Sequence, residues 1–364
     1  MTRRYLRLKR SLEEEEKEKE RDNRIRPVIS YIRRPDWSLD NPGSHFFHND
    51  QDFIEYLRCR FSKEEIRILI PILGIENIPW RNRLQPSAEL AICILLHRLS
   101  ASGTRLKDEI KIFRHSRSYI SLVFNDILMY LCRRFCHLLF WDSQRLTLSK
   151  ISEYADAVEN VVGGRGVWGW IDGTMRPFCR PGENQAAYYS GHKKSHGFQF
   201  QSIMTPDGIM SSLHGPYAGP SGDWMMWNNS GIEAILHELL GDGVRHQRYY
   251  LYGDLAYWPS FGIMGPFQST SDIPLSRTEE AANLLMSSSR IAVEWGFGLN
   301  VNFWGINNYK KGSKIMSSPV AAYYLVSTLL TNMYTCLKGR NIVSDKFNCS
   351  PPSIEEYVRT VYSK

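Results

Sequence analysis

HGFQFQSIMTPDGIMSSLHG, residues 196–215, is the stretch that decides the fold. Polar and apolar residues alternate before TPDG, and the strand pattern resumes after it. Pro206 presets the backbone for a turn and Gly208 supplies a free φ, so the stretch predicts a β-hairpin. Upstream, the apolar segment GVWGWID ends on Asp172 and predicts a further strand.

The segments downstream of the hairpin alternate between helix and strand patterns. SGIEAILHELLGDG, residues 230–243, predicts an amphipathic helix, and RYYLYGD predicts a strand that ends on Asp254. Ser276 and Glu279 form a predicted capping box at the start of a long helix that carries Glu294. The order strand, hairpin, helix, strand, helix favours an α/β unit with a mixed sheet covered by helices.

The remaining segments differ in composition. Residues 1–45 are highly charged and interrupted by prolines, so we expect a flexible arm. The apolar run at residues 318–337 predicts a buried closing helix, whereas the chain from about Gly339 looks loop-rich and peripheral. The expected domains are the charged arm (1–45), a helical domain (46–155), the α/β domain (156–340) and a C-terminal tail (341–364).

A helix-turn-helix pattern lies within the helical region. A short helix at about residues 106–113 precedes the polar turn RHSRS, and an amphipathic helix follows. Arg114, Arg117 and Ser118 would lie near the start of the second helix, where base and phosphate contacts are made. Helix pairs with a purely structural role produce the same pattern, so both interpretations stay open at this point.

Composition and charge limit the class of protein. Lys and Arg total 45 against 38 Asp and Glu, and the resulting net charge of +7 suits a polyanionic partner. No apolar run approaches the roughly 18 residues of a membrane span, and no secretory signal is recognisable. The basic cluster from Arg3 to Arg10 is compatible with nuclear import and equally with a solvated helix start.

The cysteines indicate a reducing compartment. All seven are scattered, and several lie inside apolar segments. Cys132, Cys136 and His137 are close in sequence, but no second Cys or His pair completes a tetrahedral zinc site. We therefore interpret these cysteines as small apolar residues.

Two aspartates follow apolar strands directly, at the sheet edge where sites form in α/β proteins. Gly173 and Gly253 flank Asp172 and Asp254, so nothing bulky blocks their approach. Converging carboxylates are hard ligands that suit Mg²⁺ or Mn²⁺. Glu294 is a third candidate ligand, with Arg290 one turn earlier. Taken singly, each acid could equally be a turn former, a cap or a solvated side chain.

The amino-acid sequence around these acids resembles the PIF/Harbinger superfamily of transposases, and the resemblance covers about residues 50–340. Asp172 and Asp254 are 82 residues apart, and Glu294 follows 40 residues later, which matches the order and spacing of that family. The stretches that carry the resemblance are IDGTMRPF (171–178), YYSGHKKSHGFQFQSIMTPDGIM (188–210), YGDLAYW (252–258) and RIAVEWGFGLNVNFW (290–304).

The resemblance implies an RNase H-like catalytic core preceded by the helix-turn-helix. Asp172, Asp254 and Glu294 would then be the catalytic and metal-binding acids of a DDE-type nuclease. Such enzymes cut DNA at element ends and join 3′-hydroxyls to target DNA by a two-metal mechanism with Mg²⁺ or Mn²⁺. A Myb-like DNA-binding partner, a homo-oligomer and a nuclear location are also implied. Related host genes have kept the fold without mobility, so a silent DNA-binding or adaptor protein and a host nuclease remain alternatives.

The chain departs from the family pattern in two places. Leu255 stands where a small polar residue is common, and GPSGDW keeps Asp223 without basic neighbours. Asp223 is either an additional site acid or a turn residue, and we favour its interpretation as a turn residue. A basic strip beside the core is a candidate for phosphate contacts, although an exposed solvated loop fits it equally. The strip consists of His192, Lys193, Lys194 and His196.

Overall fold

A computed structural model describes residues 37–40, 50–101, 103–104, 106–241, 249–269, 274–310, 313–315 and 318–362. The expected charged arm, with its basic cluster, lies outside these ranges except for residues 37–40. Within this short piece Trp37 and Leu39 are buried, and the Trp37 ring lies 5.8 Å from that of Phe113. Residues 37–40 therefore pack on the helical region, and the prediction of a flexible arm is wrong for them.

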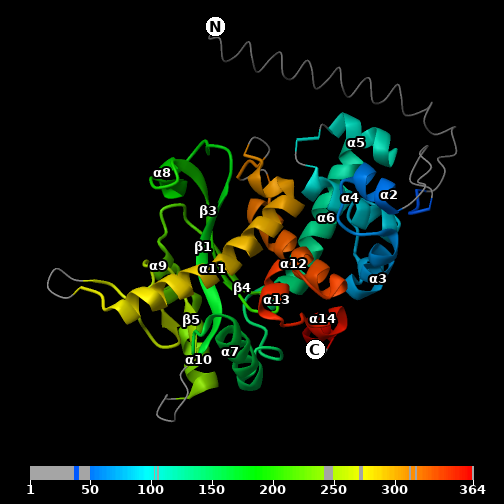
Figure 1. Ribbon diagram of the computed structural model, residues 1–364. Coiled ribbons are helices and arrows are strands. Elements are labelled where there is room, and N and C mark those ends of the chain that lie inside the picture. The colour runs from blue at the N-terminus through cyan, green and yellow to red at the C-terminus, as the bar shows by residue number, and fades with distance from the viewer. Residues whose placement is uncertain are drawn as a thin grey trace, which may run out of the picture.

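The N-terminal half of the described chain is helical, as predicted (Figure 1). The capping box at Ser62 and Glu65 starts the second of these helices. The longest helix of this region, α6, packs against α4, α5 and the later helix α12 (Val320–Lys338). The elements are α2 (Asp50–Leu57), α3 (Lys63–Leu73), η1 (Ile75–Asn77), α4 (Ala88–Ser100), α5 (Leu106–Phe113), α6 (Arg117–Phe135) and η2 (Cys136–Leu139).

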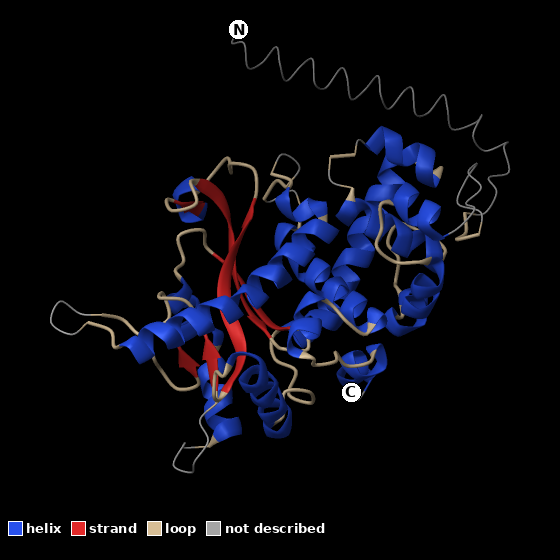
Figure 2. Cartoon of the chain, in the orientation of Figure 1, coloured by secondary structure: helices blue, strands red, loops and turns tan. Residues whose placement is uncertain are grey.

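A six-stranded mixed sheet forms the second half (Figure 2). Its order is β2-β3-β1-β5-β6, with β4 paired to β3. Strand β3 is antiparallel to its neighbours β1 and β4, whereas β5 and β6 run parallel to β1. The hairpin prediction is confirmed, because β3 and β4 flank a turn in which Gly208 has a φ of 78°. The strands are β1 (Val167–Pro177), β2 (Tyr189–Ser190), β3 (Ser195–Met204), β4 (Met210–Tyr217), β5 (Tyr250–Tyr252) and β6 (Ile263–Met264).

Helices cover the sheet, which agrees with the predicted RNase H-like α/β class (Figure 1). One core joins α9 and α10 to the sheet through Trp227 and Leu236, and another joins α11 and α13 through Val293 and Phe347. The predicted capping box at Ser276 starts α11. The remaining elements are α7 (Leu148–Val162), α8 (Gln185–Tyr188), α9 (Asp223–Ser230), α10 (Ile232–Leu240), α11 (Arg277–Phe303), η3 (Gly305–Asn308), α12 (Val320–Lys338), α13 (Ile342–Phe347) and α14 (Ile354–Tyr362).

The helical region and the sheet share one hydrophobic core. The largest cluster includes Leu95 and Phe124 of the helical region, Phe200 of β3, and Leu329 of the closing helix α12. The domain boundary expected at residues 155/156 falls inside α7, which packs against β1. Because the core is continuous, the helical region is built onto the sheet rather than separated from it by a linker.

The C-terminal residues are not the loop-rich, peripheral tail that we expected. They form α13 and α14, and Tyr357 and Val358 are buried in the main core. Ser353 and Glu356 cap the start of α14 through reciprocal hydrogen bonds of 3.2 and 2.9 Å. The prediction failed because the two helices are short, and tertiary burial of a few apolar residues stabilises them. In the part of the chain that the structure describes, no helix is both long and apolar enough to cross a membrane.

Acid should destabilise the protein through His97, which is buried on α4. Its Nδ1 lies 2.8 Å from the Leu57 carbonyl oxygen, and burial lowers the pKa of His97 to about 4. The unfolded chain, with an ordinary His pKa near 6.5, therefore binds a proton that the folded chain refuses. This contribution to the free energy of unfolding is complete above pH 6.5 and falls by roughly 3 kcal/mol as the pH drops to 4.

Urea unfolding at pH 7.5 and pH 4.5 measures the effect. We expect His97→Gln to flatten the loss of stability with acid, while replacement of the exposed His192 by Gln leaves the wild-type loss in place. Equal acid sensitivity of the wild type and His97→Gln would show that another group is responsible.

Candidate active site

Asp254 lies two residues beyond the last residue of β5, whereas Asp172 lies inside β1, which continues to Pro177, so the expectation that Asp172 ends a strand is wrong. We call the place where these two acids lie close together the acid edge. The pairing of Trp170 with Tyr252 in the parallel strands β1 and β5 places them there. The Asp172 Oδ1 accepts a hydrogen bond of 2.8 Å from the Gly173 N–H. The Asp254 Oδ1 accepts one of 2.9 Å from the Ala256 N–H. The strand register therefore brings together two acids that are far apart in sequence.

Glu294 reaches this edge from α11, and Arg290 connects it to Asp172. The Arg290 Nη1 donates to the Asp172 Oδ2 at 2.9 Å, and its Nη2 donates to the Glu294 Oε1 at 3.0 Å. The i,i+4 pair expected between Arg290 and Glu294 is therefore present. The contact with Asp172, 118 residues away in sequence, was not foreseen. One guanidinium pairs with both carboxylates and offsets one of their two negative charges.

Asp223 is a fourth acid at the same edge, and our interpretation of it as a turn residue is wrong. It is the first residue of α9. A Cβ atom added to Gly173 would collide with the Asp223 carboxylate, so this carboxylate fills the space that the glycine leaves beside Asp172. The sequence contained only one signal for this contact, the glycine itself, which we read as free access.

The electrostatics follow from burial and crowding of the acids. Desolvation by burial raises the pKa of Asp172 to about 6 against the lowering effects of Arg290 and the Gly173 N–H, and the charges of Asp254 and Asp223 raise it further. Burial also raises the pKa of Asp223, the nearby Asp254 adds to that rise, and Lys193 opposes it. The aspartates repel one another, which is the condition that a bound cation relieves.

A buried scaffold supports the loop after β5. A Cβ at Gly253 would collide with the Tyr257 ring, so this glycine makes room for a packed aromatic side chain. Gln201 of β3 donates through Nε2 to the Tyr257 Oη at 3.0 Å and to the Asp223 carbonyl oxygen at 2.9 Å. The hydrogen bonds therefore tie β3, α9 and the Asp254 loop into one unit.

The donor set fits a hard divalent cation. Asp172, Asp254, Glu294 and Asp223 supply only carboxylate oxygens, which suit Mg²⁺ or Mn²⁺ rather than softer metals. Within the described ranges no three His, Cys, Asp or Glu side chains are grouped so that one ion could be held as they stand. In this arrangement the guanidinium of Arg290 is paired with both Asp172 and Glu294.

The predicted DNA contacts lie in two separate places. Arg117 and Ser118 are exposed at the start of α6, after the α5–α6 turn, whereas Arg114 in the turn is half-buried. The middle of α6 packs against other helices, and its exposed residues lie in the first turn and at Arg133 and Arg134 in the last turn. This arrangement limits base contacts to a few side chains.

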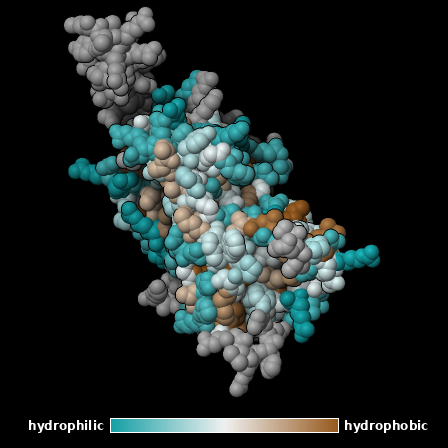
Figure 3. Space-filling view, turned by 90° about the vertical axis from the view of Figure 1, so that its left-hand side faces the viewer, coloured by the Kyte–Doolittle hydropathy of each residue, from teal (hydrophilic) through white to brown (hydrophobic). Residues whose placement is uncertain are grey.

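The basic strip lies beside the acids. His192, Lys193 and Lys194 are exposed in the turn before β3, and the ring of the half-buried His196 lies 5.1 Å from that of Tyr189. Lys193 opposes the rise in the pKa of Asp223, so this one lysine of the strip is near enough to act on that carboxylate. Figure 3 shows a face that is mostly polar, with apolar residues confined to small patches.

The fold and the acid edge together define an RNase H-like protein with a carboxylate site. Residues 171–346 match the family described as DDE superfamily endonuclease, which is just under half of the chain. This region contains all four acids and is similar to the nuclease domain of DDE transposases. Comparisons with curated proteins and with solved structures found no match.

Proposed function

We propose that this protein is a DDE-type DNA endonuclease and transposase of the PIF/Harbinger kind. The observation that carries the proposal is the placement of Asp172 in β1 and of Asp254 just beyond the adjacent parallel strand β5, with Glu294 linked to Asp172 through Arg290. The match of residues 171–346 to DDE superfamily endonucleases supports the same chemistry. The motifs quoted from the sequence support the narrower assignment to PIF/Harbinger.

In this proposal Asp172, Asp254 and Glu294 hold Mg²⁺ or Mn²⁺. When bound, such ions activate a water or 3′-hydroxyl and stabilise the leaving oxygen of a phosphodiester. The chain's own contribution is to fix the carboxylates on a rigid sheet and to exclude water around the half-buried Asp172. Arg290 pairs with Asp172 and Glu294 and offsets one of their two negative charges, so a cation held by these acids would compete with it.

The endonuclease part is tested by nicking of supercoiled plasmid in Mn²⁺ or Mg²⁺, with EDTA as the control. The transferase part is tested by joining a labelled oligonucleotide with a free 3′-hydroxyl to the plasmid. Nicking with joining supports a transposase, and nicking without joining indicates a host nuclease of the same fold. Absence of metal-dependent nicking and joining contradicts the enzymatic proposal.

A catalytically silent DNA-binding or adaptor protein is the second candidate, and Arg290 is the observation that favours it. Its two ion pairs satisfy Asp172 and Glu294 without any metal. DNA binding with no heat of Mn²⁺ binding would support this alternative. A Myb-like DNA-binding partner, a homo-oligomer that pairs two ends and a nuclear location are further parts of the transposase proposal.

Lys193 and Lys194 are proposed to contact DNA phosphates beside the acids. Each phosphate contact makes the fall of log K with log salt steeper by about 0.9. Lys193→Ala and Lys194→Ala should therefore each make the measured slope shallower by about that amount. Fluorescence anisotropy between low and moderate salt measures it. Arg340→Ala, which removes an exposed cation paired with Asp345, is the control. Wild-type slopes for both lysine variants would remove this strip from the DNA interface.

A further inference from the structure

Asp223 is fixed beside Asp172 by its neighbours on β1 and β3. The Gln201 Nε2 holds the backbone carbonyl of Asp223 at 2.9 Å, and Gln201 itself pairs across the sheet with Gly173. The first turn of α9 is therefore attached to β3. The orientation of the Asp223 side chain follows from this attachment and from the space at Gly173.

Gly173 is a glycine because of space and not because of backbone conformation. It lies in the regular part of β1, paired with Gln201, and it is absent from the residues with a positive φ. A Cβ there would overlap the Asp223 carboxylate and approach the Met226 side chain to 3.1 Å. Any larger residue at position 173 would move the Asp223 carboxylate away from Asp172.

A second feature of the same place is an unused buried acceptor. Gln201 is 1% exposed, and its Oε1 has no hydrogen-bond partner within the described part of the chain. A buried amide oxygen without a donor costs free energy unless a ligand or water satisfies it. The amide nitrogen of the same side chain donates to the Asp223 backbone carbonyl and to the Tyr257 Oη, so this acceptor lies next to Asp223.

Helix capping does not explain the position of Asp223. The cap residue of α9 is Gly222, and no side-chain hydrogen bond caps this helix. An acid in the first turn interacts favourably with the helix dipole wherever its side chain points. The dipole alone therefore gives no reason for a carboxylate packed against a glycine next to another buried aspartate.

We propose that Asp223 binds the same divalent cation as Asp172 and Asp254, so that four acids rather than three form the site. The inference rests on the proposed function, because it assigns a further ligand to that metal site. Asp223 belongs to α9, whereas Glu294 belongs to α11. The two helices thus supply one acid each to the pair of strand aspartates.

Calorimetric titration of the full chain with Mn²⁺ alone tests the inference. We expect Asp223→Asn to weaken Mn²⁺ binding at least about tenfold, as loss of groups at a metal site does. Asp156→Asn, which changes an exposed carboxylate on α7, should stay within about twofold of the wild type. Wild-type affinity in Asp223→Asn together with lost affinity in Asp172→Asn overturns this inference and leaves the proposed function standing. Unchanged binding in Asp172→Asn, or no binding by the wild type, overturns both.

Two further measurements separate a metal ligand from a purely structural helix residue. If Asp223 is a metal ligand that its neighbouring acids repel, Asp223→Asn should have an unchanged or higher melting temperature in EDTA. A dipole role predicts a lower melting temperature with unchanged Mn²⁺ affinity, which contradicts the inference. Gly173→Ala displaces the Asp223 carboxylate and should weaken Mn²⁺ binding as Asp223→Asn does. The double variant should show no further loss, because both changes remove the same interaction. An additive loss of Mn²⁺ affinity in the double variant would show that Gly173 does not act through Asp223.

Discussion

Asp172→Asn should leave the protein folded and slow Mn²⁺-dependent plasmid nicking on the order of 10³-fold. The amide keeps the shape of the side chain and can still accept the 2.8 Å hydrogen bond from the Gly173 N–H. It removes the negative charge that attracts the cation, and a metal ion contributes several kcal/mol of transition-state stabilisation. A loss of about 4 kcal/mol corresponds to the expected reduction in rate.

The matched changes at the other acids make the result specific. Asp254→Asn and Glu294→Gln should also reduce nicking strongly, whereas Asp156→Asn on the exposed side of α7 should nick like the wild type. Circular dichroism and thermal unfolding establish that each variant is folded. Nicking at the wild-type rate by folded Asp172→Asn protein would remove Asp172 from the active site.

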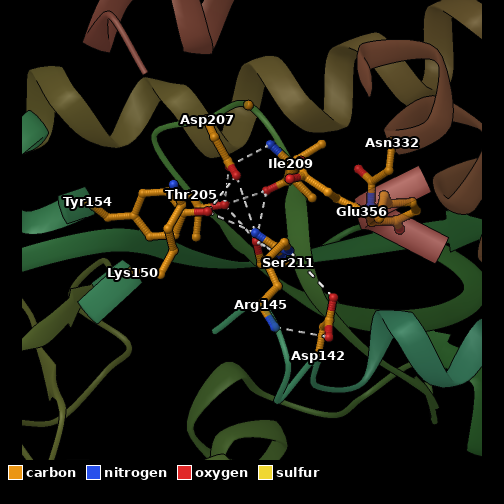
Figure 4. Close-up of polar contacts among 12 residues, drawn as sticks. Asp142, Arg145, Lys150, Tyr154, Thr205, Asp207, Ile209, Ser211, Asn332 and Glu356 are labelled. Atoms are coloured by element: carbon orange, nitrogen blue, oxygen red, sulfur yellow. Dashed lines mark hydrogen bonds and ion pairs between the residues drawn. The ribbon is translucent and has the colours of Figure 1, made fainter. Parts of the chain in front are cut away.

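Arg145→Met should lower the free energy of unfolding by about 3–5 kcal/mol. Arg145 is almost fully buried between two buried acids, and its Nη1 lies 3.2 Å from the Asp207 Oδ2 (Figure 4). Its Nε lies 3.6 Å from the Asp142 Oδ2, and its Nη2 donates to the Ser211 Oγ at 2.7 Å. Methionine fills a similar volume but leaves two buried carboxylates without their cation.

The network explains why this arginine matters more than a surface arginine. It connects the loop before α7 to the turn of the β3–β4 hairpin, and Tyr154 of α7 donates to the Asp207 Oδ2 at 2.5 Å. Arg340→Met removes an exposed pair with Asp345 and should change stability by less than about 1 kcal/mol. Urea unfolding at pH 7 measures both.

A compensating change provides the internal control. Arg145→Met with Asp207→Asn removes one of the stranded charges, so the double variant should be more stable than the sum of the single changes predicts. Equal stability losses for Arg145→Met and Arg340→Met would show that the buried network contributes no more than a surface pair.

The parts of the fold that could be predicted from sequence are those with local signals. The hairpin follows from TPDG at its turn, and the capping box at Ser276 marks a helix start that the structure contains. The apolar runs before Asp172 and Asp254 were also visible, and Asp254 does follow the end of β5, but β1 continues past Asp172 to Pro177. Local chemistry determines these features, so they can be predicted from a single sequence.

The parts that could not be predicted depend on contacts between distant residues. The ion pair between Arg290 and Asp172 spans 118 positions, and no local pattern encodes it. Asp223 shows no motif by itself, and its role emerges only when α9 lies against Gly173. Likewise, α14 is short, and burial of Tyr357 against the core stabilises it more than helix propensity does. Tertiary packing decides all three.

The most direct test of the central claim is the anomalous scattering of Mn²⁺ in crystals of the full chain. We predict a manganese peak about 2.1 Å from carboxylate oxygens of Asp172 and Asp254, with Arg290 turned away from Asp172. Peaks elsewhere, or no peak at this edge at Mn²⁺ concentrations that saturate binding in solution, would contradict the assignment of a metal-dependent nuclease site.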